Sequence, residues 1–193
     1  MSQTDFDKEL LVSNLLEAKT LQELYQKEKI LTNAKMIALQ NEPIVGRLDY
    51  AHLKAIHAFL FSDVYEWAGK DRYESDIRAD FGKGTTHFTA YDKLPHVSKL
   101  LFDALKDEAY FQGQEKKDFT KSVAMFMNGL NILHPFREGN GRVQRIFMEY
   151  VAKEAGYTLS FTNISADEMI KASILGAKGD VSAMIDIFSK SIS

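Results

Sequence analysis

The 193-residue sequence contains no cysteine, three prolines and one tryptophan. Without cysteine the chain can form neither a disulfide bond nor a thiolate metal site. It also lacks an uncharged apolar run of about 18 residues, the length that a membrane-spanning helix needs, so we expect no membrane span. The first residues show neither the basic nor the apolar region of a secretion signal. We therefore expect a cytoplasmic protein, with delivery to another cell by a dedicated secretion system left open.

An excess of basic residues is missing as well. The chain has 24 Lys and Arg against 27 Asp and Glu, a formal net charge of −3. Proteins that bind the phosphate backbone of nucleic acids usually carry a strong basic excess, so we expect no nucleic-acid partner. With 45% hydrophobic and 26% charged residues the composition is that of an ordinary globular protein, and the length predicts one domain over residues 1–193.

Apolar residues recur at helical spacing along most of the chain. We expect one long helix over residues 6–40, and further helices whose starts are capped by Asp49, Asp92, Asp118, Ser165 and Asp180. Residues 77–90 differ, because two glycines signal a tight turn and several threonines favour extended backbone. The sequence thus predicts an all-α fold with one small β-hairpin. An inert surface hairpin is the simplest alternative for that segment.

The densest cluster of chemically useful side chains runs from His134 to Arg145, between two helical patterns. Pro135 lacks an N–H and restricts its predecessor, so it should end the first helix and leave the His134 imidazole at the helix exit. An imidazole titrates near neutral pH, which suits His134 to act as a general base.

The same cluster is suited to bind phosphate. Gly139 and Gly141 permit backbone angles that turn several N–H groups toward one anion, and a helix N-terminus adds a favourable dipole. Arg142 and Arg145, three residues apart, should share a helix face and donate to phosphate oxygens. Beside a phosphate, the Glu138 carboxylate needs a hard cation, so we expect it to hold Mg²⁺. The alternative is a helix hairpin with a salt bridge and glycines in its turn.

Residues 134–145 resemble the signature of the Fic (filamentation induced by cAMP) domain family. That signature is His-Pro-Phe, any residue, Asp or Glu, Gly-Asn-Gly-Arg, two residues and Arg, and every position is met here. The similarity continues through residues 56–61, 64–70 and 77–78, and covers about residues 40–160. The resemblance implies a compact helical bundle with one small hairpin, the flap, beside the active site, and flanking helices at both ends.

The resemblance also implies an activity, the transfer of AMP from ATP to a Ser, Thr or Tyr hydroxyl of a target protein. His134 would be the base, Glu138 would hold Mg²⁺ between the α- and β-phosphates, and Arg142 would bind the γ-phosphate end. The nucleotide-binding residues would be Lys83, Gly84, Asn131, Arg137, Gly139, Asn140, Gly141, Arg142 and Arg145. The Asn140 amide would contact diphosphate oxygens, whereas Asn131 could instead make a core hydrogen bond. The flap residues Thr85, Thr86, His87 and Phe88 would align the target as an added strand.

Other readings of the activity stay open at this point. The scaffold could use another nucleotide, transfer phosphate or phosphocholine, or remove AMP, or it could be a nucleotide-sensing module without catalysis. Family members often carry an inhibitory helix with Ser or Thr, three residues, Glu, then Gly or Asn. Here Ser13 and Glu17 match, but Ala18 does not. We therefore expect Arg142 to be uncovered, residues 1–20 to matter little for activity, and inhibition to come from a separate small antitoxin chain or another route.

Overall fold

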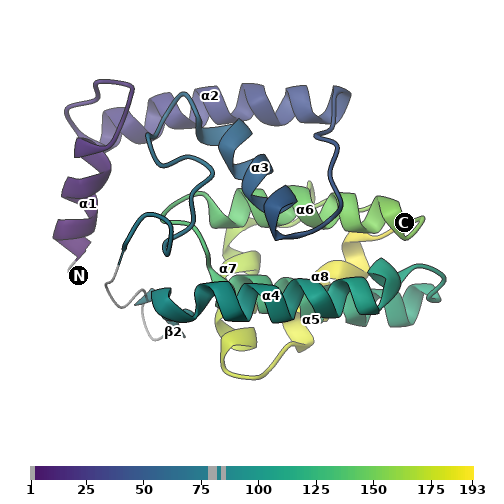
Figure 1. Ribbon diagram of the computed structural model, residues 1–193. Helices are drawn as coiled ribbons and strands as arrows, with labels where there is room; N and C mark the ends of the chain where they lie inside the picture. The colour runs from purple at the N-terminus through teal and green to yellow at the C-terminus, as the bar shows by residue number, and fades with distance from the viewer. Residues whose placement is uncertain (1–2, 78–81, 84–85) are drawn as a thin grey trace.

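The computed structural model describes residues 3–77, 82–83 and 86–193, and the chain there is mainly helical (Figure 1). The α-helices are α1 (Gln3–Val12), α2 (Leu21–Asn41), α3 (Tyr50–Phe61), α4 (Leu94–Asp107), α5 (Lys116–Leu133), α6 (Asn140–Glu154), α7 (Ala166–Ala177) and α8 (Ser182–Ser191). Two 3-10 turns, η1 (Tyr91–Lys93) and η2 (Ala109–Phe111), flank α4. The predicted all-α fold is confirmed. Within the described ranges no helix is both long enough and apolar enough to span a bilayer.

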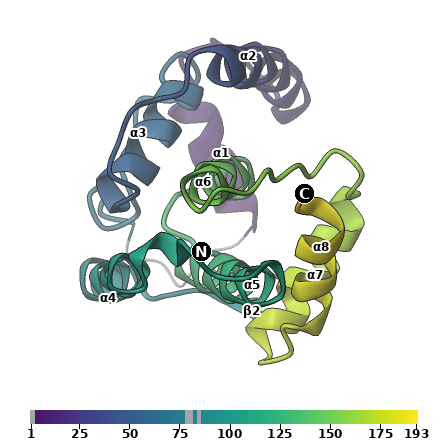
Figure 2. The same cartoon turned by 90° about the vertical axis from the view of Figure 1, so that its right-hand side faces the viewer.

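Helix α6 lies at the centre of the molecule, as the end-on view of Figure 2 shows. It is surrounded by α2 and α3 on one side and by α5, α7 and α8 on the other. Its buried residues point in several directions: Val143 and Met148, which are both fully buried, lie about 140° apart around the helix. A helix that is apolar on more than one face belongs inside a protein, and here it carries the second half of the His134–Arg145 motif into the core.

The hairpin segment contains two strands of two residues each, β1 (Gly82–Lys83) and β2 (Thr86–His87). They pair antiparallel, with Gly82 opposite His87 and Lys83 opposite Thr86. Strand β2 also contacts α7. Gly84 and Thr85, which were expected in this turn, lie outside the described residues.

Two of the predicted helix starts are confirmed and three are displaced, since the caps of α4 and α8 are Lys93 and Val181 rather than Asp92 and Asp180. The Asp49 carboxylate accepts a hydrogen bond from the His52 N–H at 2.8 Å, and Ser165 and Glu168 form the expected capping box. Helix α5 instead begins at Lys116 with Glu115 at its cap, so Asp118 lies inside the first turn. A helix start set by backbone geometry alone leaves no side-chain signal in the sequence.

The prediction of a single helix over residues 6–40 is wrong, because the chain breaks between α1 and α2. The Asn14 amide donates to the Leu11 carbonyl at 2.5 Å and accepts from the Ala18 N–H at 2.9 Å. Such side-chain bonds to nearby backbone compete with helical hydrogen bonds. The Leu15 N–H then bonds the Val64 carbonyl at 2.8 Å, which turns α1 onto the end of the bundle where the motif lies.

Candidate active site

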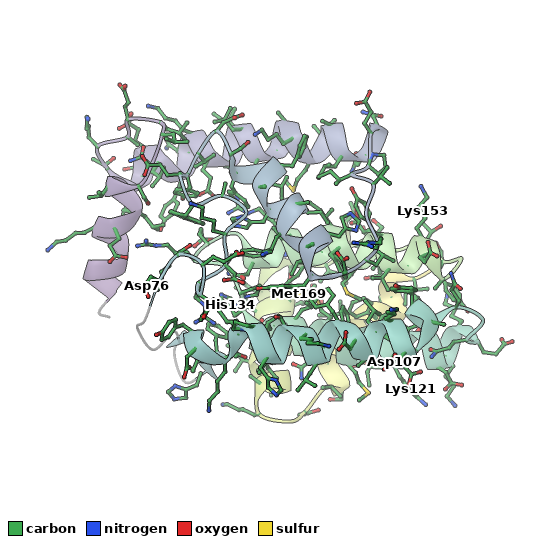
Figure 3. The ribbon with its side chains drawn as sticks, in the orientation of Figure 1. Asp76, Asp107, Lys121, His134, Lys153 and Met169 are labelled. Atoms are coloured by element: carbon green, nitrogen blue, oxygen red, sulfur yellow. The ribbon has the colours of Figure 1, made fainter. Side chains whose placement is uncertain are left out.

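His134 stands at the exit of α5, as predicted. Its N–H still donates to the Leu130 carbonyl at 3.0 Å, but its backbone is left-handed, with φ 43° and ψ 60°. This conformation is uncommon for a residue with a Cβ, and it ends the helix before Pro135. The turn directs the imidazole into a cavity, whose lining also includes Met169 of α7 (Figure 3).

This cavity has a volume of about 390 Å³, within the range of small-molecule sites. One wall comes from α7 and is mostly apolar: Ala166, Met169, Ile170, Ser173 and Ile174. The facing wall comes from α5, α6 and the motif, and it brings polar groups: Asn131, His134, Gly141, Gln144 and Arg145. Such a site can enclose an apolar ring system on one side and hold charged groups on the other.

Of the two glycines that were expected to form a phosphate-binding nest at the N-terminus of α6, only Gly139 has a positive φ. Gly139 has φ 80°, and a Cβ at this position would lie 2.3 Å from the Phe61 ring, so only glycine fits. Helix α6 starts at the next residue, and Gly141 in its first turn lines the cavity. The first N–H groups of a helix have no intrahelical acceptor and favour an anion. The helix N-terminus therefore faces the same cavity as His134.

The expected contact between the Asn140 amide and phosphate is not made by this arrangement. The Asn140 side chain is buried and bonds the backbone of Phe136 on both sides: its Oδ1 accepts from the Phe136 N–H at 2.9 Å, and its Nδ2 donates to the Phe136 carbonyl at 2.6 Å. The amide thus closes the loop between the base and α6. Its bonds fix the backbone of the loop that leads into α6.

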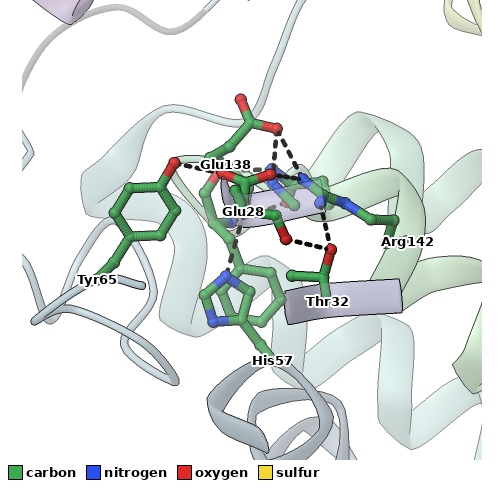
Figure 4. Close-up of polar contacts among 9 residues, drawn as sticks. Glu28, Thr32, His57, Tyr65, Glu138 and Arg142 are labelled. Atoms are coloured by element: carbon green, nitrogen blue, oxygen red, sulfur yellow. Dashed lines mark hydrogen bonds and ion pairs between the residues drawn. The ribbon is translucent and has the colours of Figure 1, made fainter. Parts of the chain in front are cut away.

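Glu138 is the loop residue directly before Gly139, and both its side chain and its backbone have hydrogen-bond partners. Its carboxylate accepts from the Gly139 N–H at 2.8 Å, and its carbonyl oxygen lies 3.2 Å from His57 Nε2 (Figure 4). His57 Nδ1 accepts from the Gly69 N–H at 2.8 Å, so Nε2 carries the proton and donates to Glu138. Burial lowers the pKa of His57 to about 3, which keeps this ring neutral. His57 therefore supports the backbone of the acidic residue.

Arg142 is covered by residues of α2, which corrects the expectation from the sequence that it would be free. Its guanidinium forms an ion pair of 2.5 Å with the Glu28 carboxylate and donates to the Thr32 hydroxyl at 3.1 Å (Figure 4). Glu28 is only 4% exposed and also accepts a hydrogen bond from the Tyr65 hydroxyl. Burial, with Glu28 adding to it, raises the pKa of Tyr65, so this hydroxyl keeps its proton. Glu17, by contrast, is exposed in the connection between α1 and α2.

Arg145 takes the place in the cavity that was expected for both arginines. Residues three apart differ by about 60° around a helix, enough here to send Arg142 toward α2 and Arg145 toward the cavity. Burial lowers the pKa of Arg145, and the nearby positive charge of Arg142 adds to this effect. A partly buried cation next to a helix N-terminus would be stabilised by a bound anion.

Arg137 also departs from its expected place at the nucleotide. Its side chain is 9% exposed, forms an ion pair with Glu9 of α1, and lies 6.0 Å from the centre of the Trp67 ring. The Trp67 indole N–H donates to the Ser13 hydroxyl at 3.0 Å. Arg137 thereby joins the motif loop to the N-terminal helix.

This attachment changes what we expect of the N-terminal residues. Leu10 of α1 is fully buried, so Leu10→Ala should lower the free energy of unfolding by roughly 2 to 3 kcal/mol. This is the low end of the usual range, because a terminal helix can shift to fill part of the space that the leucine side chain leaves. Urea denaturation checks this value, with Val12→Ala as control because Val12 is 86% exposed. A Leu10→Ala protein as stable as the Val12→Ala control would show that α1 is not part of the core.

Phe88, directly after β2, stacks on the His134 imidazole with ring centres 3.7 Å apart and planes at 8°. Phe88 also lines the cavity, while His87 is exposed. The backbones of Lys83 and Thr86 lie in the paired strands, but their side chains, like all of Gly84 and Thr85, are outside the described residues. Asn131 lines the cavity and donates to the Ser173 carbonyl at 3.3 Å, so its position fits both roles considered for it.

Known proteins resemble this chain in sequence and in fold. A family model described as "Fic/DOC family" matches residues 47–152, more than half of the chain. The chain belongs to the Fic/DOC family. The "Probable protein adenylyltransferase Fic" of Escherichia coli K12 is 34% identical over 183 residues, which cover 95% of this chain and 88% of that protein.

Another relative of this Fic chain is the "Protein adenylyltransferase VbhT" of Bartonella schoenbuchensis, 34% identical over 179 residues. That match covers 93% of this chain but only 36% of VbhT, so the chain spans about a third of that relative. Among solved structures, BepC from Bartonella tribocorum with bound AMPPNP has a TM-score of 0.83 at 26% identity, covering 93% of this chain and 91% of that one. A Bartonella quintana Fic domain with bound ADP has a TM-score of 0.84 at 28% identity, covering 93% and 89%.

The Fic motif did not point to three buried polar residues that the structure places around it: Glu28, Arg72 and Gln144. A signal for Glu28 exists in the sequence, because Leu24, Glu28 and Thr32 are spaced four apart and so put two polar residues on the buried face of α2. Two apolar residues of the same helix, Tyr25 and Ile30, are by contrast 42% and 70% exposed.

Proposed function

We propose that this chain transfers AMP from ATP to a Ser, Thr or Tyr hydroxyl of a target protein. One observation carries the proposal: the His134 imidazole and the N-terminus of α6 open onto the same cavity of about 390 Å³. Curated relatives of similar sequence are named protein adenylyltransferases, and two similar structures hold AMPPNP or ADP. A base and an anion site that share one nucleotide-sized cavity support a reaction at a phosphate.

In the proposed reaction His134 accepts the proton of the incoming hydroxyl. The hydroxyl oxygen attacks the α-phosphorus, the bond from that phosphorus to the bridging oxygen of the β-phosphate breaks, and pyrophosphate leaves. The product is AMP joined to the target through a phosphoester. A positioned base contributes about 10²- to 10⁴-fold in such reactions, and the remaining terms are orientation and fixed electrostatic stabilisation.

The phosphates are proposed to lie at the N-terminus of α6. Its first N–H groups, at Asn140 and Gly141, would receive phosphate oxygens, and Arg145 from the same helix would bind the γ-phosphate end. Arg142 would not contact the phosphates directly, because its guanidinium is bound to Glu28 and Thr32 of α2. This assignment exchanges the roles of the two arginines relative to the sequence-based expectation.

Glu138 fits a Mg²⁺ ion that is shared with the nucleotide. No group of three or more His, Asp or Glu side chains that could hold a metal occurs among the described residues, so the protein alone offers one carboxylate here. Mg²⁺ commonly takes one or two carboxylates together with substrate phosphates and water. When bound, it would neutralise phosphate charge; the chain's own part is to hold Glu138 in place through His57 and Gly139.

Glu138→Gln should raise the Mg²⁺ concentration needed for transfer, because an amide cannot neutralise the charge of the cation. A Mg²⁺ titration of the initial transfer rate measures this shift, with Glu66→Gln as the same change at an exposed position. Full wild-type activity in excess chelator would contradict the metal assignment.

The hairpin of β1 and β2 is proposed to receive the target. An exposed strand edge binds an extended peptide by adding it as a further strand. The end of this hairpin reaches the base, since Phe88 stacks on His134. The contacts of Lys83 and Gly84 with phosphates, a separate antitoxin chain and a cytoplasmic location stay predictions from the sequence.

Pure protein incubated with a cell lysate and with ATP labelled at either the α- or the γ-phosphate tests the proposal. We expect protein to acquire the α label and not the γ label. Transfer of the γ label would indicate phosphorylation and contradict the proposal. Absence of both labels at every nucleotide concentration would instead favour a nucleotide-sensing module.

A further inference from the structure

Arg72 is a fully buried arginine in the connection that follows α3, outside the Fic motif. Its guanidinium donates to three backbone carbonyls: Nε to His134 at 2.9 Å, and Nη2 to Thr89 at 2.7 Å and to Leu133 at 3.2 Å. Burial lowers its pKa to about 10, so Arg72 stays charged at neutral pH. One buried cation therefore joins two segments that are far apart in the sequence.

The first segment is the end of α5, which carries the base. The last carbonyls of a helix lack intrahelical donors, and a cation at this end is also favoured by the helix dipole. Arg72 supplies both, and its own N–H bonds the Pro135 carbonyl at 2.8 Å. The left-handed backbone of His134 costs roughly 1 to 2 kcal/mol and persists only where its surroundings hold it. Bonds to Leu133, His134 and Pro135 hold it here.

The second segment is the exit of the hairpin. The Thr89 N–H and hydroxyl both donate to the Ile132 carbonyl, at 2.9 and 3.2 Å, and the Thr89 carbonyl accepts from Arg72. The preceding residue is Phe88, whose ring lies 3.7 Å from the His134 imidazole. The same guanidinium thus bonds the backbone of His134 and the backbone of Thr89, the residue next to Phe88, whose ring stacks on the imidazole.

We propose that Arg72 is a positioning residue for the transfer reaction, acting through the orientation of the His134 imidazole and the place of Phe88. This inference rests on the proposed function of the site. The arginine fork is planar and reaches several acceptors in fixed directions, whereas a lysine has one nitrogen on a flexible stem. Arg72→Lys keeps the charge but cannot satisfy the three carbonyls together, so the imidazole loses its fixed orientation.

The first test is the kinetics of Arg72→Lys, with Arg47→Lys as the matched control because the Arg47 side chain is 91% exposed. We expect kcat for transfer to fall roughly 10- to 100-fold, the size of effect that a misplaced catalytic group produces. Affinity for ATP, measured by equilibrium binding, should change no more than about twofold, since Arg72 bonds backbone carbonyls and lies outside the cavity wall. An unchanged kcat, or a loss of ATP affinity and folded protein that accounts for it, would overturn the proposal.

A double-mutant cycle with Phe88→Leu tests the coupling between the two segments. If both residues act through one imidazole, the double variant should lose no more kcat than the worse single variant. Losses that multiply would show independent roles and contradict the proposal.

An NMR measurement separates this inference from the proposed function, because it needs no transfer. Stacking on Phe88 should shift the ring-proton signal of His134, identified by its absence in His134→Gln, away from that of an exposed histidine. Arg72→Lys should move the signal toward the exposed position, and Arg47→Lys should not. If the wild-type protein transfers no AMP but Arg72→Lys still moves the His134 signal, the proposed function is refuted and the positioning role is kept. An unmoved signal would refute the positioning role alone.

Discussion

His134→Ala is expected to slow AMP transfer by roughly 10²- to 10⁴-fold while leaving ATP affinity within a few fold. The imidazole faces the cavity at the exit of α5, where it can accept the hydroxyl proton, whereas the proposed phosphate contacts come from the start of α6 and from Arg145. Single-turnover transfer of AMP from ATP labelled at the α-phosphate gives the rate, and equilibrium titration with ATP gives the affinity.

His96→Ala is the matched control, because His96 is an exposed residue of α4 and is not part of the motif. It should transfer AMP at the wild-type rate. Near wild-type turnover by His134→Ala on a native target would refute the assignment of the base. A large loss of ATP affinity in that variant would mean that His134 binds the nucleotide instead.

Glu28→Ala is expected to lower the free energy of unfolding by about 3 to 5 kcal/mol, the usual cost of removing one partner of a buried ion pair. The Glu28 side chain is 5% exposed and that of Arg142 is 21% exposed, so the remaining arginine would keep only the more distant Glu138 carboxylate, 3.7 Å away, in a place that water reaches poorly. The Tyr65 hydroxyl would lose its acceptor as well. Urea denaturation followed by circular dichroism measures the change.

Two further variants make this result specific. Glu28→Gln can still accept from Tyr65, so its loss should be clearly smaller than that of Glu28→Ala. Glu17→Gly should be within about 0.5 kcal/mol of wild type, because Glu17 is exposed and its φ of 53° suits glycine. Equal stability of Glu28→Ala and Glu17→Gly would show that the buried pair contributes nothing to the fold.

The features that the sequence predicted are those that depend on neighbours along the chain. Pro135 marks the end of α5, Gly139 is required by its positive φ, and the capping box at Ser165 starts α7. Each has its cause within a few residues, so the pattern of residue types is enough to find it. The helical class of the fold follows from the same local periodicity.

The directions of the motif side chains could not be predicted in this way. Arg137 and Arg142 turn from the cavity toward Glu9 of α1 and Glu28 of α2, more than a hundred residues earlier in the chain. Asn140 turns inward because the Phe136 backbone offers it both a donor and an acceptor. Partners that are distant in sequence decide these contacts, and only the folded arrangement of α1, α2 and α6 brings them together.

The apolar wall of the cavity was missed for the same reason. Met169 and Ile170 lie on a helix with an ordinary amphipathic pattern, and nothing in that pattern says that α7 packs beside the motif. The proposed Arg72 role is likewise visible only when its three carbonyl acceptors are seen together.

The central claim is that this chain joins AMP to a protein hydroxyl with His134 as the base, and mass spectrometry of the modified protein tests it most directly. Wild-type and His134→Ala proteins are incubated with ATP, Mg²⁺ and the lysate proteins that acquire the α label, and the mass gained, the modified residue and the other product are identified. We predict a gain of one AMP on a Ser, Thr or Tyr, one pyrophosphate released per adduct, and almost no adduct with His134→Ala. A phosphate adduct accompanied by ADP, or an AMP adduct that forms equally fast with His134→Ala, would contradict the account.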